Sequence, residues 1–132
     1  MCRLAKVNKK DIVYDLGCGD GTALIIGAKE FGARGVGIEI DPLRALISTL
    51  MIHIMRVQDK VRIIRKNFYD VNISKASIVF VYLVPRVLQK LRSKFLKELR
   101  PGTVIISYRY KIKLPLVDFD KANEIYLYRI KK

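Results

Sequence analysis

Short apolar runs alternate along the chain with longer segments of helical periodicity, and this alternation predicts an α/β fold. Runs rich in Val, Ile and Tyr indicate strands, whereas apolar residues spaced three and four apart indicate helices. A mostly parallel sheet with both faces covered accounts for the order of these segments. The expected strands span residues 12–16, 35–40, 61–65, 77–83, 103–107, 116–119 and 124–130, and the expected helices span residues 22–31, 42–57 and 85–99.

Several helix boundaries carry their own signals. Gly32 is placed to cap the C-terminus of the first helix, and Asp41 followed by Pro42 gives an N-cap and a proline at the first helical position of the second. The second helix is apolar around much of its circumference, so we expect it to be buried. An exposed portion would instead be a candidate dimer or membrane contact. The last two strands are expected to form a terminal hairpin.

A glycine-rich turn between the first strand and the first helix is the strongest functional signal. The stretch 15–21 reads Asp-Leu-Gly-Cys-Gly-Asp-Gly, and a turn of this kind at a helix N-terminus cradles nucleotide-like cofactors in open α/β sheets. Its G-x-G-x-G spacing differs from the G-x-G-x-x-G of dinucleotide folds, and its acids suit a ligand with an amine or a sulfonium. The stretch resembles the first motif of class I S-adenosylmethionine-dependent methyltransferases.

Two further signals follow the second and third strands. Glu39 lies about twenty residues after Gly19, where an acid accepts hydrogen bonds from ribose hydroxyls; alone, such a residue would be a solvated cap. Asn67 can accept a hydrogen bond from an adenine amine with Phe68 near the ring, or it can simply start a turn. The expected cofactor-binding residues are Asp15, Gly17, Cys18, Gly19, Asp20, Gly21, Glu39, Ile40, Asn67, Phe68 and Tyr82.

The end of the fourth strand predicts the acceptor. DNA and RNA amino-methyltransferases carry Asn/Asp/Ser-Pro-Pro-aromatic there, whereas this chain has Tyr82-Leu83-Val84-Pro85. Cytosine C5 methylation needs a cysteine nucleophile near this place, and Cys2 and Cys18 lie elsewhere. An apolar slot instead suits an aliphatic chain ending in an amine, although Tyr82 can also be a buried strand residue. The slot candidates are Tyr82, Leu83, Pro85 and Tyr108, no catalytic base is expected, and His53 is expected to be structural.

The charge and the size of the chain limit the kinds of partner that we expect. The 132 residues fit one domain and include 26 Lys and Arg against 12 Asp and Glu, a net charge of +14. Such a field favours nucleic acid, an acidic protein or an anionic membrane surface, unless it is only a solvated basic surface. Polar residues interrupt the longest apolar stretch, so no membrane span is expected. With two separated cysteines and no leader, we expect a cytoplasmic protein and no metal site.

A closer resemblance extends over residues 4–107 and the last strand. The segments Gly37–Pro42, Val81–Leu83 and Leu96–Thr103, with the glycine turn and Asn67-Phe68, resemble small archaeal protein-lysine methyltransferases and the mitochondrial lysine methyltransferases of ATP synthase c-subunit and adenine nucleotide translocase. The resemblance implies a Rossmann-like, doubly wound seven-strand sheet with an antiparallel last strand. It also implies S-adenosylmethionine as donor, S-adenosylhomocysteine as product and a protein lysine as acceptor.

The chain departs from this family in two places. Only eleven residues precede Ile12, so the N-terminal cover of the domain is expected to be short, and an open site predicts weak cofactor affinity. After the fifth strand, Tyr108 and Tyr110 stand where relatives carry other aromatic residues, and Arg109, Lys111 and Lys113 favour a lysine in acidic surroundings. An RNA methyltransferase with RNA contacts on the basic surface, and a non-catalytic basic binding module, remain alternatives.

Overall fold

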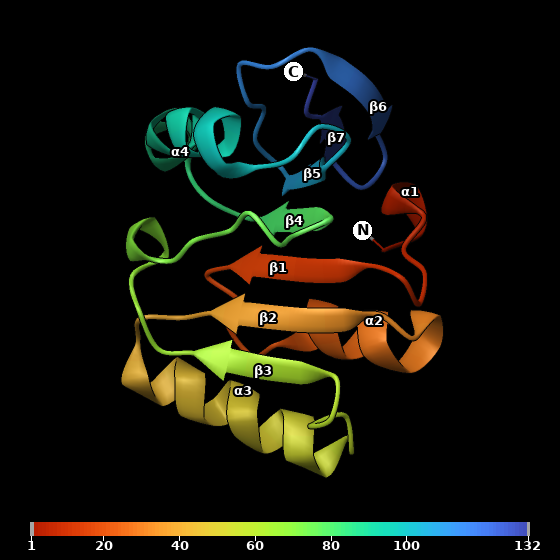
Figure 1. Ribbon diagram of the computed structural model, residues 1–132, viewed down its shortest axis with the longest axis vertical. Helices are drawn as coiled ribbons and strands as arrows, with labels where there is room; N and C mark the ends of the chain where they lie inside the picture. Colours follow the sequence, from red (N-terminus) through yellow and green to blue (C-terminus); the bar gives the residue numbers. More distant parts are fainter. Residues whose placement is uncertain (1, 132) are drawn as a thin grey trace.

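The computed structural model describes residues 2–131 and forms a single seven-strand sheet between helices (Figure 1). The strand order is β3-β2-β1-β4-β5-β7-β6, with β7 antiparallel to both of its neighbours and the other pairs parallel. The predicted doubly wound sheet with an antiparallel last strand is thus confirmed. The elements are α1 (Cys2–Ala5), β1 (Ile12–Leu16), α2 (Thr22–Phe31), β2 (Arg34–Ile38), α3 (Pro42–Ile54), β3 (Val61–Ile64), η1 (Phe68–Asp70), β4 (Ile78–Val81), α4 (Pro85–Glu98), β5 (Val104–Tyr108), β6 (Leu116–Asp120) and β7 (Ile125–Arg129).

Element boundaries differ from the predicted ones by a few residues. The strand β2 ends at Ile38, so Glu39 lies just beyond the strand instead of within it. The helix α3 ends at Ile54, three residues early, because Arg56 adopts a φ of 58° that an α-helix does not contain. The predicted caps are confirmed: Gly32 has a φ of 73°, and the Asp41 carboxylate accepts from the N–H groups of the second and third residues of α3.

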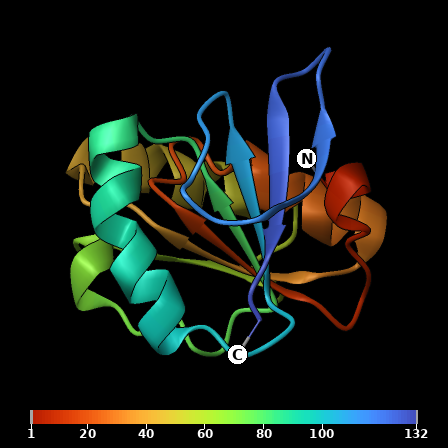
Figure 2. The ribbon, with the colours of Figure 1, turned by 90° about the horizontal axis from the view of Figure 1, so that it is seen from above.

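The helices divide into two layers, as Figure 2 shows with α4 on one side of the sheet and α1 and α2 on the other. The side chains of α4 that face the sheet are Leu88, Leu91 and Phe95, and all three are buried. The Glu98 carboxylate accepts from the Ile73 N–H at 3.1 Å and pairs with Lys94 at 2.6 Å. The contact with Ile73 fastens the segment between β3 and β4, which contains the short turn η1, to the end of α4.

Two glycines in β2 let α2 lie close to the sheet. A Cβ on Gly35 would lie 2.9 Å from Leu24 Cδ2, and one on Gly37 would lie 2.7 Å from Ile63 Cδ1 and 2.8 Å from Cys18 Sγ. All three distances are shorter than van der Waals contact allows. Because Gly35 and Gly37 have no side chains, α2 can pack directly on β2. This packing also sets the position of the glycine turn that precedes α2.

The expectation that α3 is buried is wrong for most of its surface. Only Ala45, Ser48 and Ile52 are buried, because α3 covers the edge of the sheet with one narrow face and no other element of residues 2–131 packs on the opposite face. The aliphatic residues on its outer face are 37–68% exposed: Leu43, Leu46, Ile47, Leu50, Met51 and Ile54. None of the helices in residues 2–131 is long and apolar enough to cross a membrane.

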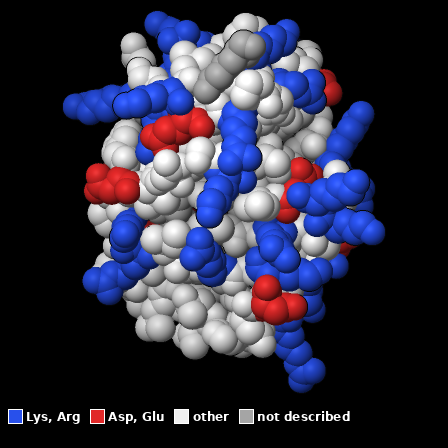
Figure 3. Space-filling model, viewed as in Figure 1, with Lys and Arg blue, Asp and Glu red and all other residues white. Residues whose placement is uncertain are grey.

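Basic side chains spread over the molecule. Figure 3 shows Lys and Arg across the whole face, with few acids, and an uncharged area at the lower end, where α3 lies in Figure 1. Only two ion pairs form among the described residues, Lys94–Glu98 and Arg109–Glu124. Most of the positive charge is therefore available for attraction of anionic partners.

Candidate functional site

The glycine turn has the backbone that its sequence predicts. Gly17, Gly19 and Gly21 have φ angles of 75°, 59° and 79°, in the left-handed region that favours glycine. A Cβ on Gly19 would meet nothing within 4 Å, so it would project into open space at the carboxyl ends of the parallel strands. This is the property of a cradle that a ligand fills, because the ligand can approach the backbone directly.

Glu39 closes this turn from the neighbouring strand. Its side chain is buried, with 6% exposed, and its two oxygens accept from the N–H groups of Gly19 at 3.1 Å and Asp41 at 3.2 Å. Each carboxylate oxygen keeps a lone pair for another donor. Ile40, the next residue, is 61% exposed beside it. The structure thus brings Glu39 and the turn into direct contact, as the spacing predicted, and its role toward a ribose stays a prediction.

Asp15, at the end of β1, carries a carboxyl whose environment disfavours ionisation. Burial, together with the carboxylates of Glu39 and Asp20, raises its pKa to about 7. The Asp20 carboxyl behaves in the opposite way, because hydrogen bonds from the Thr22 hydroxyl and N–H lower its pKa. A cationic group beside Asp15 would favour the ionised carboxylate, so this corner of the cradle suits an amine or a sulfonium.

Cys18 is a structural member of the turn. Burial and the nearby Asp15 carboxylate raise the pKa of its thiol to about 12, so at neutral pH it is a thiol and a poor nucleophile. Both Cys18 and Cys2 are free and buried. Within residues 2–131, no group of three His, Cys, Asp or Glu side chains is arranged to hold a metal ion.

Ser48 is a residue of this site that sequence reasoning missed. Its buried hydroxyl donates to the Gly19 carbonyl, lies 2.9 Å from the Arg44 carbonyl and 3.8 Å from Cys18 Sγ. It thereby ties α3 to the middle of the glycine turn. The available signal was a serine on the same helical face as Ala45 and Ile52, because a hydroxyl on a buried face needs a partner.

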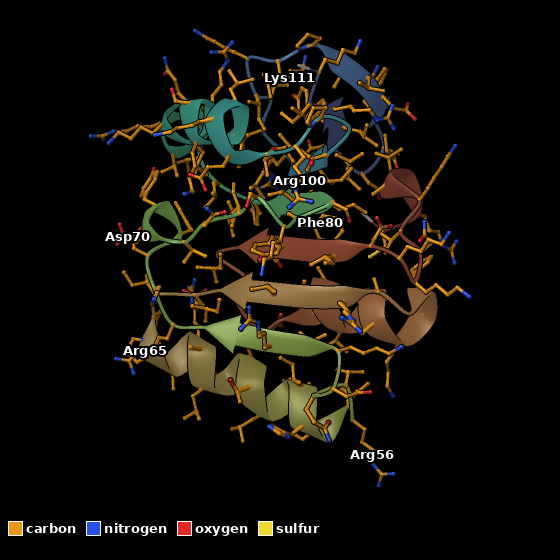
Figure 4. All side chains as sticks on the ribbon, in the orientation of Figure 1. Arg56, Arg65, Asp70, Phe80, Arg100 and Lys111 are labelled. Carbon is orange, nitrogen blue, oxygen red and sulfur yellow. The ribbon has the colours of Figure 1, made fainter. Side chains whose placement is uncertain are left out.

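Asn67 follows β3 and opens η1. Its Oδ1 accepts from the Tyr69 N–H at 3.0 Å, so the turn-starting interpretation of this residue is realised in the structure. A carbonyl oxygen has two lone pairs, and the second is compatible with an adenine amine. Phe68 is partly buried and meets Tyr69 edge-on, with ring centroids 4.8 Å apart. Figure 4 labels Asp70 at the end of η1, beside the strand ends.

Three tyrosines gather at the ends of β4 and β5. The Tyr82 ring meets the Tyr108 ring edge-on, with centroids 4.8 Å apart, and is stacked on the Tyr110 ring at 6.4 Å. Arg109, which lies between Tyr108 and Tyr110 in the sequence, has a φ of 71°. The Tyr110 N–H donates to the Tyr108 carbonyl at 2.9 Å. This tight turn places the rings of Tyr108 and Tyr110 on the side of Tyr82. The Arg109 guanidinium donates to the Tyr82 hydroxyl at 3.3 Å. Tyr82 is 54% exposed, so it is not a buried strand residue.

The remaining slot candidates lie at different distances from the turn. Leu83 Cδ2 lies 3.8 Å from the position of a Cβ on Gly17, so Leu83 joins the tyrosine cluster to the cradle. Pro85 is exposed as the first residue of α4, which explains its presence through helix initiation. His53 is exposed in the last turn of α3, on a different element from the tyrosines and the glycine turn.

A cleft of about 790 Å³ runs along α2 between α1 and the hairpin of β6 and β7. Thr22 at one end belongs to the segment after the glycine turn, and Tyr108 belongs to the tyrosine cluster, so the cleft adjoins both parts of the site. It holds three of the chain's acids, Glu30, Asp120 and Glu124. The remaining lining residues are Cys2, Arg3, Leu4, Ala23, Ile26, Phe31, Ala122, Asn123 and Ile125.

Known proteins are similar to this chain in sequence and in fold. A family model, the ANTKMT methyltransferase domain, matches residues 15–117. The chain is 37% identical to a protein-lysine N-methyltransferase of Saccharolobus islandicus, over 98% of this chain and 86% of that protein. It is 32% identical to the adenine nucleotide translocase lysine N-methyltransferase of Mus musculus, over 76% of this chain but only 44% of that protein. A crystal structure described as an RNA methyltransferase from Salinibacter ruber, in complex with S-adenosyl-L-homocysteine, superposes with a TM-score of 0.93 at 36% identity, over 99% of this chain and 88% of that chain.

Proposed function

Because the chain belongs to the ANTKMT methyltransferase domain family and is an S-adenosylmethionine-dependent methyltransferase, we propose that it methylates the side-chain amine of a protein lysine. The observation that carries the proposal is the exposed tyrosine cluster, which adjoins a glycine cradle through Leu83. Two relatives bear the names of protein-lysine methyltransferases, and their names support the same acceptor class.

The donor fits the cradle through this chain's own residues. The backbone at Gly19 leaves space for a ligand, and Asp15 offers a carboxyl that a cationic group would stabilise in its ionised form. Glu39 is the residue for the ribose, with Ile40, Asn67 and Phe68 for the adenine. When bound, S-adenosylmethionine supplies a methyl group on a sulfonium, and its product is S-adenosylhomocysteine.

The tyrosine cluster suits a lysine side chain. Aromatic faces attract an ammonium group by cation–π interaction and also pack against its aliphatic stem. The lysine must lose its proton before it attacks, and its ordinary pKa is about 10.4. When S-adenosylmethionine is bound, its sulfonium and the Arg109 guanidinium beside Tyr82 lower that pKa, because like charges disfavour the ammonium form. Water reaches this place, since Tyr82 is 54% exposed, so the proton leaves to solvent without a dedicated base. Alignment of the amine supplies the acceleration.

The surroundings of the acceptor lysine follow from the charges near the slot. In the cleft along α2, Glu30 and Asp120 attract a basic side chain, whereas Glu124 already pairs with Arg109. Lys111 and Lys113 follow Tyr110 in the sequence, and their charges favour acidic neighbours of the acceptor lysine. Both cysteines are free thiols, which supports a reducing, cytoplasmic setting.

Calorimetric titration with S-adenosylmethionine tests the cradle. The variants Gly19→Ala and Gly102→Ala make a matched pair, because both glycines have positive φ and a Cβ on either would meet nothing within 4 Å. We expect similar losses of stability in both variants but a loss of affinity, by about tenfold or more, only in Gly19→Ala. Equal affinities in the two variants would contradict this assignment of the cradle.

Transfer of a radiolabelled methyl group tests the acceptor. Cell protein and RNA are offered together, with ribonuclease and protease treatments as controls, and the labelled residue is identified by mass spectrometry. The expected result is label on protein lysine that survives ribonuclease. Label that is found only in RNA would overturn the proposal.

RNA is the second candidate acceptor, and two observations favour it. The Salinibacter ruber protein, with a TM-score of 0.93, is described as an RNA methyltransferase, and the net charge of +14 suits a nucleic acid. The sequence at the end of β4 disfavours RNA as the acceptor. Tyr82-Leu83-Val84-Pro85 lacks the polar residue and paired prolines that orient the exocyclic nitrogen of a nucleic-acid base in amino-methyltransferases. The labelling experiment separates the two candidates directly.

A further inference from the structure

The outer face of α3 is not part of the methyl-transfer site described above. Six aliphatic residues recur there at helical spacing, and each is between 37% and 68% exposed: Leu43, Leu46, Ile47, Leu50, Met51 and Ile54. We call this set the α3 stripe. The buried face of the same helix holds only Ala45, Ser48 and Ile52, so α3 presents its more apolar side outward. Exposed apolar side chains that gather on one face of a helix mark an interaction surface on a protein.

Basic residues frame the α3 stripe. Arg44 is exposed on the helix itself, and Figure 4 labels Arg56 beyond its C-terminal end and Arg65 near its other end. Between Pro42 and Lys66 the chain carries six Lys or Arg residues and a single acid, Asp59, and α3 itself carries no acid. In Figure 3 the uncharged lower area has basic side chains on both sides. The frame is therefore positive while the centre is apolar.

We propose that the α3 stripe docks the protein on an anionic lipid surface, with α3 lying in the plane of the headgroups. A helix with an apolar Leu- and Ile-rich face and basic margins binds in this way, because the aliphatic side chains enter the acyl boundary while the cations meet lipid phosphates. The helix lies at one end of the molecule's long axis (Figure 1), so a flat surface can reach the whole stripe. This docking does not depend on the identity of the methyl acceptor.

Charge argues against a second copy as the occupant. Antiparallel pairing of two α3 helices across a two-fold axis would bring Arg44 of one copy toward Arg56 of the other. Each copy has a net charge of +14, and α3 contributes no acid to offset the repulsion. A lipid surface with negative headgroups supplies the missing counter-charge.

Vesicle flotation tests the proposal on the whole chain. The vesicles are phosphatidylcholine alone, or phosphatidylcholine and phosphatidylglycerol in equal parts, each at low and high salt. We expect binding to the anionic vesicles, weaker binding at high salt, and little binding to phosphatidylcholine alone. The double variant Leu46→Ser/Leu50→Ser should bind at least about tenfold more weakly, and Arg44→Gln should lower the preference for anionic vesicles.

The control variant Leu116→Ser/Phe119→Ser removes two apolar side chains that are comparably exposed, 44% and 54%, but lie on β6. It should bind vesicles as the unchanged protein does. Thermal unfolding and S-adenosylmethionine titration of every variant show whether the fold is retained. The proposal is overturned if no vesicle binding occurs, if the β6 variant loses binding as strongly as the α3 variant, or if light scattering shows a dimer that Leu46→Ser/Leu50→Ser dissociates while vesicle binding is absent.

Discussion

Replacement of Asp15 by Asn should stabilise the protein without ligand and weaken its hold on the cofactor. The folded structure raises the pKa of Asp15 from 3.8 to about 7 through burial and the nearby Glu39 and Asp20 carboxylates. An ionised Asp15 is therefore unfavourable in the folded state above that pH. Asn has nearly the same shape and no charge, so the substitution removes this cost together with the attraction for a cationic ligand.

The size of the effect follows from the pKa difference. A raised carboxyl pKa means that the folded state binds more protons than the unfolded state between about pH 4 and pH 7, so stability falls as the pH rises through this window. The full shift corresponds to about 4 kcal/mol above pH 7, and partial solvent exposure of Asp15 reduces the expected gain in Asn to about 2 kcal/mol. Below about pH 4 both proteins carry a neutral side chain, and the difference should vanish.

Urea unfolding of both proteins at about pH 5 and about pH 8 measures this dependence. The expected advantage of Asp15→Asn is larger at the higher pH. Calorimetric titration should show that the S-adenosylmethionine affinity of the unchanged protein rises through about pH 7, where Asp15 ionises, while the Asp15→Asn affinity is lower and flat. An Asp15→Asn variant that is no more stable at either pH, with unchanged ligand affinity, would refute the reasoning.

Three further substitutions test the packing and the acceptor slot. Gly37→Ala would place a Cβ 2.8 Å from Cys18 Sγ and should lower the free energy of unfolding by about 1–3 kcal/mol in urea titration, whereas Gly27→Ala, whose Cβ would meet only Cys2 Sγ at 3.9 Å, should be neutral or stabilising. Ser48→Ala should lower the free energy of unfolding by about 1 kcal/mol, because the hydrogen bond from α3 to the Gly19 carbonyl is lost. It should also weaken S-adenosylmethionine binding in calorimetry. An unchanged affinity for S-adenosylmethionine would show that the glycine turn does not need this hydrogen bond. Tyr82→Ala should lower kcat/KM for a lysine peptide by about tenfold or more, whereas Tyr82→Phe, which keeps the ring and loses only the Arg109 contact, should lower it much less; equal losses would assign the role to the hydroxyl.

The strand ends and the glycine turn were predictable because local signals agree with the fold. The alternation of apolar runs places β1, β2 and β3 in parallel, and parallel strands bring residues 15–21, Glu39 and Asn67 to one edge of the sheet. The caps at Gly32 and Asp41 are equally local, since each depends on one residue's backbone preference or side-chain oxygen.

The exposure of α3 was not predictable in the same way. Apolar residues nearly surround this helix in the sequence, and periodicity alone does not say which face meets the sheet. The polar Ser48 marks the buried face because its hydroxyl finds the Gly19 carbonyl, a contact across 29 residues. The turn at Arg109 was also hidden, because its positive φ belongs to a residue type that gives no local signal for it.

Because β1 lies in the middle of the sheet, the strands around the cofactor site do not assemble in the order in which they are synthesised. All the cradle residues before α3 have been synthesised by residue 39, yet β1 pairs on one side with β2 and on the other with β4. The Ile12 N–H donates to the Ser77 hydroxyl, 65 residues away. A nascent chain that ends before β4 leaves β1 as an open sheet edge, and an open edge invites pairing with other chains. Both strands that flank β1, the strand that leads into the cofactor cradle, are therefore present only once the chain has been synthesised as far as β4.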